Sequence, residues 1–393
     1  MDKLRNWMHG KGRPIVIAIM CLLALWMIVD YYMDTHKKKT QEKESSAVIS
    51  MLDVEGDIVT TQEDVGSGPE AGRTSDDEIV TLGFAGDINL DERWAIMQHM
   101  RRKGKGVSGC IDSKLIRRMR QDDYMILNNE FTFSSRGKAM KGKAYTFRAP
   151  RKNVKILKQL GVDAVSLANN HTYDYGRTAF FDTMSVLKGA GIKYTGAGKN
   201  IKEAKKPVYL HCKGKTIAVI AATRAEKYVM TPGAGKKSPG VFRTYNDRAY
   251  VRAIRKAKKK ADCVIAFVHW GTEYSTVLEE AQKQQARDYI DAGADAVVGA
   301  HTHCLQGVGF YKGRPICYSL GNYWFNSKRL YTTLLQLKVK RDGKVEARML
   351  PCLQSGCETK LLTGKKEVRK FVRYVNRIST NARLGAKGLV KKK

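Results

Sequence analysis

Paired cysteine spacings are missing from this chain. Seven cysteines lie beyond the first apolar run, an odd number, and no C-x-x-C occurs among them. Their absence argues against a zinc ribbon and against a thioredoxin-type redox motif. Cys352 and Cys357 are close enough in sequence to pair if the compartment is oxidising, while several others fall in expected strands, where a buried thiol is ordinary. The cysteines therefore leave the compartment open.

Acidic residues are scarce after residue 80. Residues 81–393 hold 62 Lys and Arg but only 24 Asp and Glu, a formal balance of +38, whereas residues 1–80 balance at −5. A domain this basic repels itself unless it faces something anionic, such as nucleic acid, anionic lipid, a wall polymer or an acidic polypeptide. Nucleic acid is the least favoured of these, because the sequence shows no motif of that kind.

A signal-peptide cleavage site is also missing after the apolar run near the N-terminus. The run from Ile15 to Val29, extended by Tyr31, Tyr32 and Met33, reaches about 20 residues, the length that spans a bilayer. No small-x-small site follows it, which disfavours a cleaved signal peptide. We therefore expect a short basic tail over 1–13 and an uncleaved transmembrane anchor over 14–33. Basic residues are balanced across the span, and the short basic N-terminus favours a cytoplasmic start with the rest outside.

The remaining chain divides by composition and periodicity. Residues 34–78 are polar and acidic and contain a Gly-rich stretch, so we expect a flexible tether. From Ile79 onward strand-like and helix-like segments alternate, and two Gly-containing turns later join adjacent strands as hairpins. This order predicts a mixed α/β sandwich over 79–351, followed by a C-terminal helix and a basic tail over 352–393. No internal repeat is visible.

Five polar fragments each follow a short apolar run. They are GFAGDIN at 83–89, ILNNE at 126–130, SLANNH at 166–171, FVHWG at 267–271 and GAHTH at 299–303. Each should therefore lie at the C-terminal end of a strand, where open α/β sheets place their ligands. Carboxylate, amide and imidazole groups arriving from five strand ends predict a metal site.

Taken singly, each fragment has an ordinary structural explanation. His301 and His303 project to the same side of an extended H-x-H, but such pairs are usually structural. His269 alone would be a satisfied core histidine, and Asp87 alone a turn residue. Together these explanations fail, because half of the eight histidines fall in the fragments. We expect Glu273 to support His269 through a hydrogen bond.

The fragments also resemble those of a known family. GDIN at 86–89, NNE at 128–130, SLANNH with DYG at 174–176, HWGTEY at 269–274, GAHTH with LQ, and SLGNYWF at 319–325 are similar in order and spacing to the CapA (PgsA) family. These are capsule and poly-γ-glutamate synthesis proteins related to metallophosphatases. The resemblance runs from about residue 79 to 350, nearly the whole of the globular part.

The resemblance implies a four-layered α/β/β/α sandwich of the calcineurin-like metallophosphoesterase type. It implies metal-site positions at Asp87, Asn89, Glu130, Asn170, His269, His301 and His303. It also implies that His171, with Asp174 nearby, protonates or stabilises a leaving group, and that Asn322 supports the ligands.

Three positions depart from the phosphoesterase pattern. Asn89 stands where a histidine is usual, Glu130 where a bridging Asp is usual, and Thr172 where an acid is usual. Asn is a weaker neutral ligand, which weakens the case for a complete two-metal site. The ligand types favour Mn, Fe or Zn over Ca or Mg.

Three functions follow. The first is a membrane-anchored protein that handles an anionic polymer such as poly-γ-glutamate outside the cell, with a capsule ligase and small membrane subunits as partners implied by the resemblance. The second is an active metal-dependent phosphoesterase, which accounts for the ligands but not for the charge. The third is a non-enzymatic protein that binds anionic wall polymers, which accounts for the charge but not for the ligands. The sequence leaves open whether the chain is an enzyme.

Overall fold

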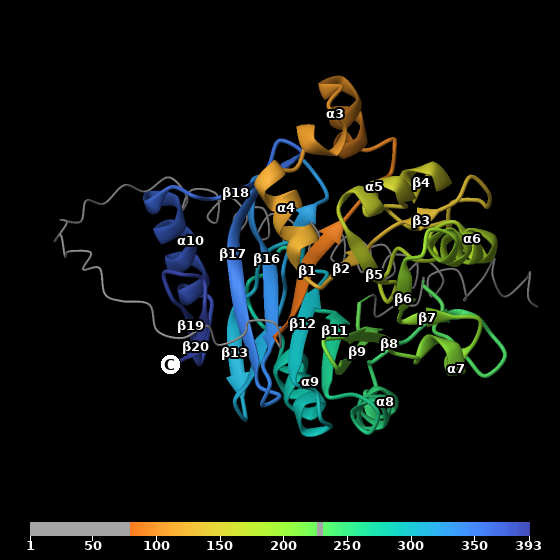
Figure 1. The fold of residues 1–393 in the computed structure, drawn as a ribbon. Coiled ribbons are helices and arrows are strands. Elements are labelled where there is room, and N and C mark those ends of the chain that lie inside the picture. Colours follow the sequence, from red (N-terminus) through yellow and green to blue (C-terminus); the bar gives the residue numbers. More distant parts are fainter. Residues whose placement is uncertain (1–78, 226–230) are drawn as a thin grey trace, which may run out of the picture. The chain divides into compact units, whose positions relative to one another are not determined.

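The computed structural model describes residues 79–225 and 231–393, all within one compact unit (Figure 1). The predicted basic tail, transmembrane anchor and tether, residues 1–78, lie outside the described residues. Among residues 79–225 and 231–393, no helix is both long and apolar enough to cross a membrane. The anchor therefore stays a prediction.

The first sheet combines parallel and antiparallel strands in the order β18-β17-β16-β1-β2-β5-β6, with β15 also pairing with β1. Its parallel strands are β1 (Val80–Ile88), β2 (Tyr124–Asn129), β5 (Val162–Ser166), β6 (Lys193–Thr195) and β15 (Asn322–Trp324). Its antiparallel strands are β16 (Leu330–Val339), β17 (Val345–Ser355) and β18 (Glu358–Leu361). The parallel strands therefore end at one edge, where β1, β2 and β5 present polar residues.

The second sheet has the order β13-β14-β12-β11-β9-β8. Its parallel strands are β9 (Lys215–Thr223), β11 (Cys263–His269), β12 (Ala296–Ala300) and β14 (Arg314–Cys317). Antiparallel strands border it at β8 (Val208–Cys212) and β13 (Val308–Tyr311). The carboxyl ends of β11 and β12 carry the histidines of two predicted fragments.

Helices cover the sheets, as Figure 1 shows. The helices are α3 (Ala95–Lys103), α4 (Ser113–Gln121), α5 (Val154–Gln159), α6 (Gly176–Gly189), α7 (Ile201–Ala204), α8 (Arg248–Lys258), α9 (Glu280–Asp291) and α10 (Lys365–Arg377). Short elements join them: η2 (Gly106–Gly109), η3 (Arg151–Asn153), β3 (Thr132–Phe133) with β4 (Arg148–Ala149), β7 (Ala197–Gly198) with β10 (Gly240–Val241), and β19 (Ala382–Leu384) with β20 (Val390–Lys392). Helices α4 to α6 accompany the first sheet, and α8 and α9 the second.

Alternation along the strands explains this layering. Phe84 of β1 and Phe267 of β11 meet edge to face between the two sheets, with ring centroids 5.6 Å apart. Neighbouring side chains point the other way, so Ala85 joins the core beneath the first set of helices and Val268 the core beneath α8 and α9. Both sheets therefore bury side chains on two faces, which is why their strands read as nearly continuous apolar runs.

Helix α4 shows how a basic segment folds here. The Asp112 side chain caps its N-terminus by accepting a hydrogen bond from Lys114 N. Leu115 and Met119, four residues apart, are fully buried against the first sheet. Burial of each stabilises the fold by roughly 1.5–3 kcal/mol. The opposite face is left to cations.

The mixed α/β fold predicted from the sequence is confirmed, with alternating strands and helices from residue 80 onward, and the expected C-terminal helix is α10. Strand β17 runs through the expected domain end at residue 351, and β18 extends the same sheet. The expected basic tail instead forms the β19–β20 hairpin, with Val390 buried. Strands β18, β19 and β20 have too few apolar positions for the sequence alone to predict them as strands. All seven described cysteines, Cys352 and Cys357 included, are free.

Candidate metal centre

The five predicted fragments converge. Two groups of side chains have ligand atoms that all lie within 4.8 Å of one another: Glu130, His269 and His301 in one, and Asp87, Glu130 and His303 in the other. All these residues are buried. Glu130 belongs to both groups, so the arrangement offers two adjacent cation positions that share one carboxylate. Two imidazoles with a carboxylate suit a transition-metal ion.

Asn128, at the end of β2, is the hub of this cluster. Its Nδ2 lies 2.7 Å from Asp87 Oδ1, 3.0 Å from Glu130 Oε2 and 3.3 Å from His269 Nδ1. Its Oδ1 accepts a hydrogen bond of 3.0 Å from Asn169 Nδ2. One amide thereby fixes ligands from β1, β2 and β11. Asn128 lies in the predicted ILNNE fragment, but no local pattern in the sequence indicates this role.

Asn170 and His269 tie the two sheets together. His269 Nε2 lies 2.9 Å from Asn170 Oδ1 and 3.6 Å from Glu130 Oε1. The backbone carbonyl of Asn170 accepts from Thr231 Oγ1 at 2.6 Å. Asn170 therefore stands beside the group formed by Glu130, His269 and His301, where the resemblance places it.

His303 connects Asp87 to Asn322. Its Nδ1 lies 2.7 Å from Asn322 Oδ1 and 3.5 Å from Asp87 Oδ2, and His301 N donates to the same Asp87 oxygen at 3.2 Å. Asn322 therefore contacts His303, one of the predicted ligands. The expected hydrogen bond from Glu273 to His269 is not found among the described residues. Glu273 nevertheless acts on the cluster: burial lowers the pKa of His301, and the Glu273 carboxylate opposes that lowering.

Burial and like charge govern the protonation of the cluster. Burial raises the pKa of Glu130 well above its usual range, and the Asp87 carboxylate raises it further. Burial lowers the pKa of His301 to about 4 and that of His269 well below its ordinary value, with neighbouring histidines adding to the effect on His269. Both imidazoles are therefore neutral near pH 7, the form that binds metal.

Unpartnered buried atoms test whether a metal fits. Among the described residues, Glu130 Oε1 and His301 Nδ1 are buried without a hydrogen-bond partner. Such atoms normally cost about 1–3 kcal/mol each. Both belong to one ligand group, and a cation there would satisfy them, so the donor set fits a divalent ion.

The Asn89 side chain is placed differently from the other predicted ligands. It is fully buried, but its Oδ1 accepts from Asp91 N at 2.9 Å in a local turn. This turn accounts for an amide at that position without a metal.

Close backbone packing holds the ligand loops. A Cβ on Gly86 would lie 1.9 Å from Gly321 O, and one on Gly299 would lie 1.8 Å from Tyr318 O. Glycine is therefore required directly before Asp87 and two residues before His301. His301 and His303 adopt positive φ values of 96° and 56°, a conformation that non-glycine residues rarely take. Strain of this kind persists where surrounding structure enforces it, commonly at functional sites.

A histidine–aspartate pair adjoins the cluster. His171 Nδ1 lies 2.7 Å from Asp174 Oδ2, and its Nε2 lies 4.0 Å from Glu130 Oε1. Asp174 also accepts from Phe147 N at 2.7 Å and pairs with Lys143 Nζ at 2.8 Å. Lys143, whose side chain is 6% exposed, was not predicted. It lies in a loop with several lysines, and the sequence does not show which of them is buried.

Aromatic rings line the histidines. The Phe147 ring lies 4.3 Å from that of His171, and the Phe325 ring 4.6 Å from that of His303. The Tyr274 ring lies 5.6 Å from His303 and carries Lys328 Nζ 3.8 Å above its centroid. Apolar walls of this kind lower the local dielectric and strengthen charge interactions in the site.

The fold and the site together define a class: mixed α/β proteins with a buried His/Asp/Glu cluster at strand ends. Within it, the chain belongs to the bacterial capsule synthesis protein PGA_cap family, whose characteristic domain matches residues 81–327. The PGA biosynthesis protein CapA of Bacillus subtilis is 30% identical over 285 residues, 71% of this chain and 73% of that protein. The capsule biosynthesis protein CapA of Bacillus anthracis is 34% identical over 247 residues, 61% of this chain and 59% of that protein.

Solved structures resemble the chain more distantly. A novel phosphatase from Mycoplasma pneumoniae aligns with a TM-score of 0.46 at 12% identity, over 71% of this chain and 95% of that one. The NAD nucleotidase NadN of Haemophilus influenzae aligns with a TM-score of 0.43 at 13% identity, over 77% of this chain and 57% of that one. The chain is thus a protein related to capsule and poly-γ-glutamate biosynthesis.

Proposed function

We propose that this chain is a membrane-anchored protein of capsule or poly-γ-glutamate synthesis or export, whose basic domain handles the anionic polymer outside the cell. Family membership carries the proposal. The balance of +38 over residues 81–393 supports an anionic partner, and the apolar run within 14–33 supports the anchor. A capsule ligase and small membrane subunits are partners under the same proposal.

The domain is proposed to hold one or two divalent ions in a sandwich of the calcineurin-like type. Asp87, Glu130 and His303 would hold one ion, and Glu130, His269 and His301 the other, with Asn170 beside the second. The donor types suit Mn, Fe or Zn. Such ions, when bound, polarise a phosphoryl or carbonyl oxygen.

A second candidate is metal-dependent hydrolysis of a phosphoester at the cell surface. The pairing of His171 with Asp174 favours it, because a carboxylate 2.7 Å from Nδ1 fixes the ring and leaves Nε2 facing the cluster. An imidazole held in this way can give a proton to a leaving group. A protein that only binds wall polymers needs neither the dyad nor the metal.

Metal content tests the proposed centre. In the purified protein, His301→Ala and His303→Ala should each lower bound metal, measured by elemental analysis, by at least half. The control is His211→Ala, which removes an exposed histidine of β8. Unchanged metal in both site variants would show that the centre is wrongly assigned. Hydrolysis of a generic phosphomonoester and phosphodiester, measured on the same samples, decides the second candidate.

Polymer binding tests the first candidate. The chain should bind poly-γ-glutamate at low salt far more tightly than a neutral glycan of similar length, because each glutamate repeat carries a carboxylate. Equal binding to the two polymers would contradict the proposed role in handling an anionic polymer, whatever the metal content.

A further inference from the structure

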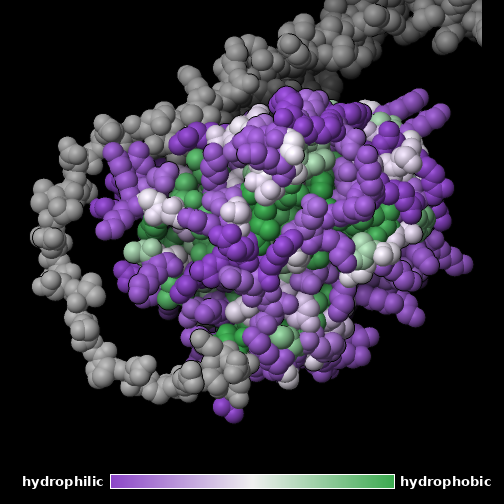
Figure 2. Space-filling view, turned by 45° about the horizontal axis from the view of Figure 1, so that its top comes forward, coloured by the Kyte–Doolittle hydropathy of each residue, from purple (hydrophilic) through white to green (hydrophobic). Residues whose placement is uncertain are grey.

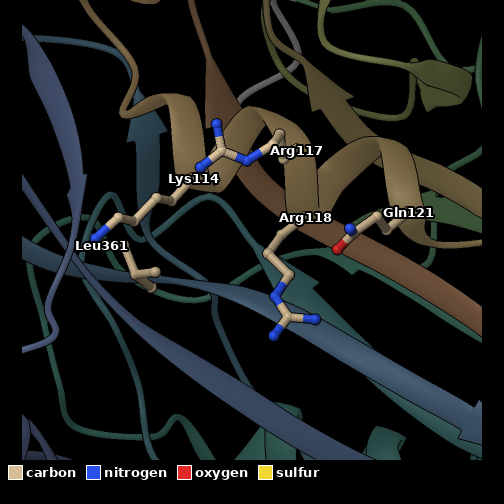
Figure 3. Close-up of a pocket in the computed structure, with 5 residues that line it drawn as sticks. All are labelled: Lys114, Arg117, Arg118, Gln121 and Leu361. Carbon is tan, nitrogen blue, oxygen red and sulfur yellow. The ribbon is translucent and has the colours of Figure 1, made fainter.

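A shallow pocket of about 360 Å³ lies on the outside of the first sheet, apart from the metal centre. It is lined by Lys114, Arg117, Arg118 and Gln121 of α4 and by Leu361 of β18 (Figure 3). The α4 residues follow the spacing i, i+3, i+4, i+7, which places them on one face of the helix. In Figure 3 the side chain of Lys114 reaches toward Leu361. We call this set the α4 pocket.

The cations of the α4 pocket have no acidic partner among residues 79–225 and 231–393. Lys114, Arg117 and Arg118 form no side-chain hydrogen bond or ion pair of 4 Å or less with an acid of the described residues. Arg118 acts at longer range on Asp122, a partly buried residue whose Oδ1 accepts from Gln336.

Neighbouring cations, in contrast, have hydrogen-bond or ion-pair partners within the described residues. Arg120, on the same helix, donates twice to the carbonyl of Gln159, and Lys103 pairs with Glu358 at 2.6 Å. Glu358 also pairs with Lys360 at 3.2 Å, so the acid of β18 is already engaged. Three adjacent cations left without acids repel one another, and an external anion relieves that repulsion.

The α4 pocket is separate from the metal centre. Leu115 and Met119 turn the other face of α4 into the core beneath the first sheet, so the cations point away from it. A ligand in the pocket would therefore be held without contacting the proposed metals.

We propose that the α4 pocket is a docking site for a linear polycarboxylate with an amide backbone; this rests on the proposed function. Arginine forks bind carboxylates in a bidentate manner. The amide of Gln121 matches a backbone amide, and the apolar Leu361 matches the methylene groups between carboxylates. Seven residues of helix span about 10 Å, enough for successive repeat units.

The test removes two adjacent cations from the full-length protein. Arg117→Ala with Arg118→Ala should weaken binding of fluorescent poly-γ-glutamate, measured by anisotropy at low salt, by roughly three- to tenfold, as expected for two exposed charge pairs. The control is Arg255→Ala with Lys256→Ala, two adjacent exposed cations on α8. It removes the same charge from the other sheet's helix layer and should change binding less than twofold. Circular dichroism and bound metal should be unchanged in both.

The outcomes separate two failures. If both double variants weaken binding equally, the polymer binds through the overall positive charge of the protein. The α4 pocket is then not a site, although the proposed function stands. If the unsubstituted protein binds poly-γ-glutamate no better than a neutral glycan, the proposed function fails. If single-stranded DNA binds as tightly and loses affinity in the same variant, the pocket is a nucleic-acid site and the proposal is overturned.

Discussion

The carboxylate of Glu130 is subject to opposing demands. Both ligand groups need it ionised, yet burial and the Asp87 carboxylate raise its pKa well above the usual range. Its Oε1 is buried without a partner among the described residues. Without metal, this side chain therefore destabilises the fold, and under the proposed function a bound ion would offset that cost.

Glu130→Gln should separate these effects. Replacing the acid by a neutral amide removes the cost of protonating and burying it, and should raise the melting temperature of metal-free protein by roughly 2–4 °C, the shift that ~1 kcal/mol gives in a large domain. Metal bound after reconstitution should fall by at least half. Calorimetry and elemental analysis measure the two quantities, with the exposed Glu280→Gln as control. Full metal binding by Glu130→Gln would contradict the shared role.

Asp122 gives a pH dependence independent of the metal centre. Burial raises its pKa from 3.8 to about 6, opposed by its hydrogen bond from Gln336 and by Arg118. The folded state therefore holds an additional proton between about pH 4 and 6, so its stability falls as pH rises through this window.

Asp122→Asn should remove that fall. At pH 7 the variant should be more stable in urea unfolding by up to ~3 kcal/mol, the equivalent of about two pKa units. At pH 4 the two proteins should be nearly equal, because Asp122 is then protonated. A constant difference between pH 4 and 7 would show that Asp122 does not titrate in this range.

The sequence predicts the types of ligand better than their connections. Asp87, Glu130 and the three cluster histidines follow apolar strands directly, so their convergence can be predicted from strand ends. Asn128 and Lys143 cannot, because their roles depend on contacts across sheets and loops that no local pattern encodes. Glu273 shows the converse, because its proximity to His269 in sequence did not become the expected hydrogen bond among the described residues. The catalytic and metal-binding roles remain predictions.

At the scale of elements, the join between β1 and the loop before β15 sets the position of Asp87. Asp87 N donates to Gly321 O at 3.0 Å, and Gly86 has no room for a side chain against the same carbonyl. The strand and the loop are thus packed backbone to backbone.

Gly86→Ala should push these elements apart. We expect a loss of roughly 1–3 kcal/mol in unfolding free energy, the usual cost of overpacking, with reduced metal binding because Asp87 moves. Gly189→Ala is the matched control: it lies exposed at the end of α6, and a Cβ there meets nothing within 4 Å. That change should be neutral or stabilise by up to ~1 kcal/mol. Equal effects of the two substitutions would argue against the close packing described.

Elements with strong periodicity were predictable, and those defined by tertiary contacts were not. The apolar run of β11 predicts a buried strand, and the spacing of apolar residues in α4 predicts an amphipathic helix. Strands β15 and β18 have three and four residues, too short to show a period, and they exist because β1 and β17 pair with them.

At the scale of the whole molecule, charge outweighs any single contact. Figure 2 shows hydrophilic residues over most of the visible face, with apolar groups between them. With a balance of +38 over residues 81–393, polymer binding should be mainly electrostatic.

The dependence of polymer affinity on salt concentration tests this electrostatic contribution. Raising ionic strength from about 0.1 to 1 M shortens the screening length from roughly 10 to 3 Å. Affinity for poly-γ-glutamate should then fall at least tenfold in titrations followed by anisotropy, while binding of any neutral glycan stays constant. Salt-independent polymer affinity would point to a recognition mode other than charge.

The shared carboxylate also limits how many ions the centre can keep. Asp87 and Glu130 together supply two negative charges, and the histidines of the two ligand groups supply none when neutral. One divalent cation therefore brings the buried centre to neutrality, and a second leaves it with a surplus of two positive charges. We expect the second ion to be retained only together with an anion, so that ion occupancy and anion binding rise and fall together.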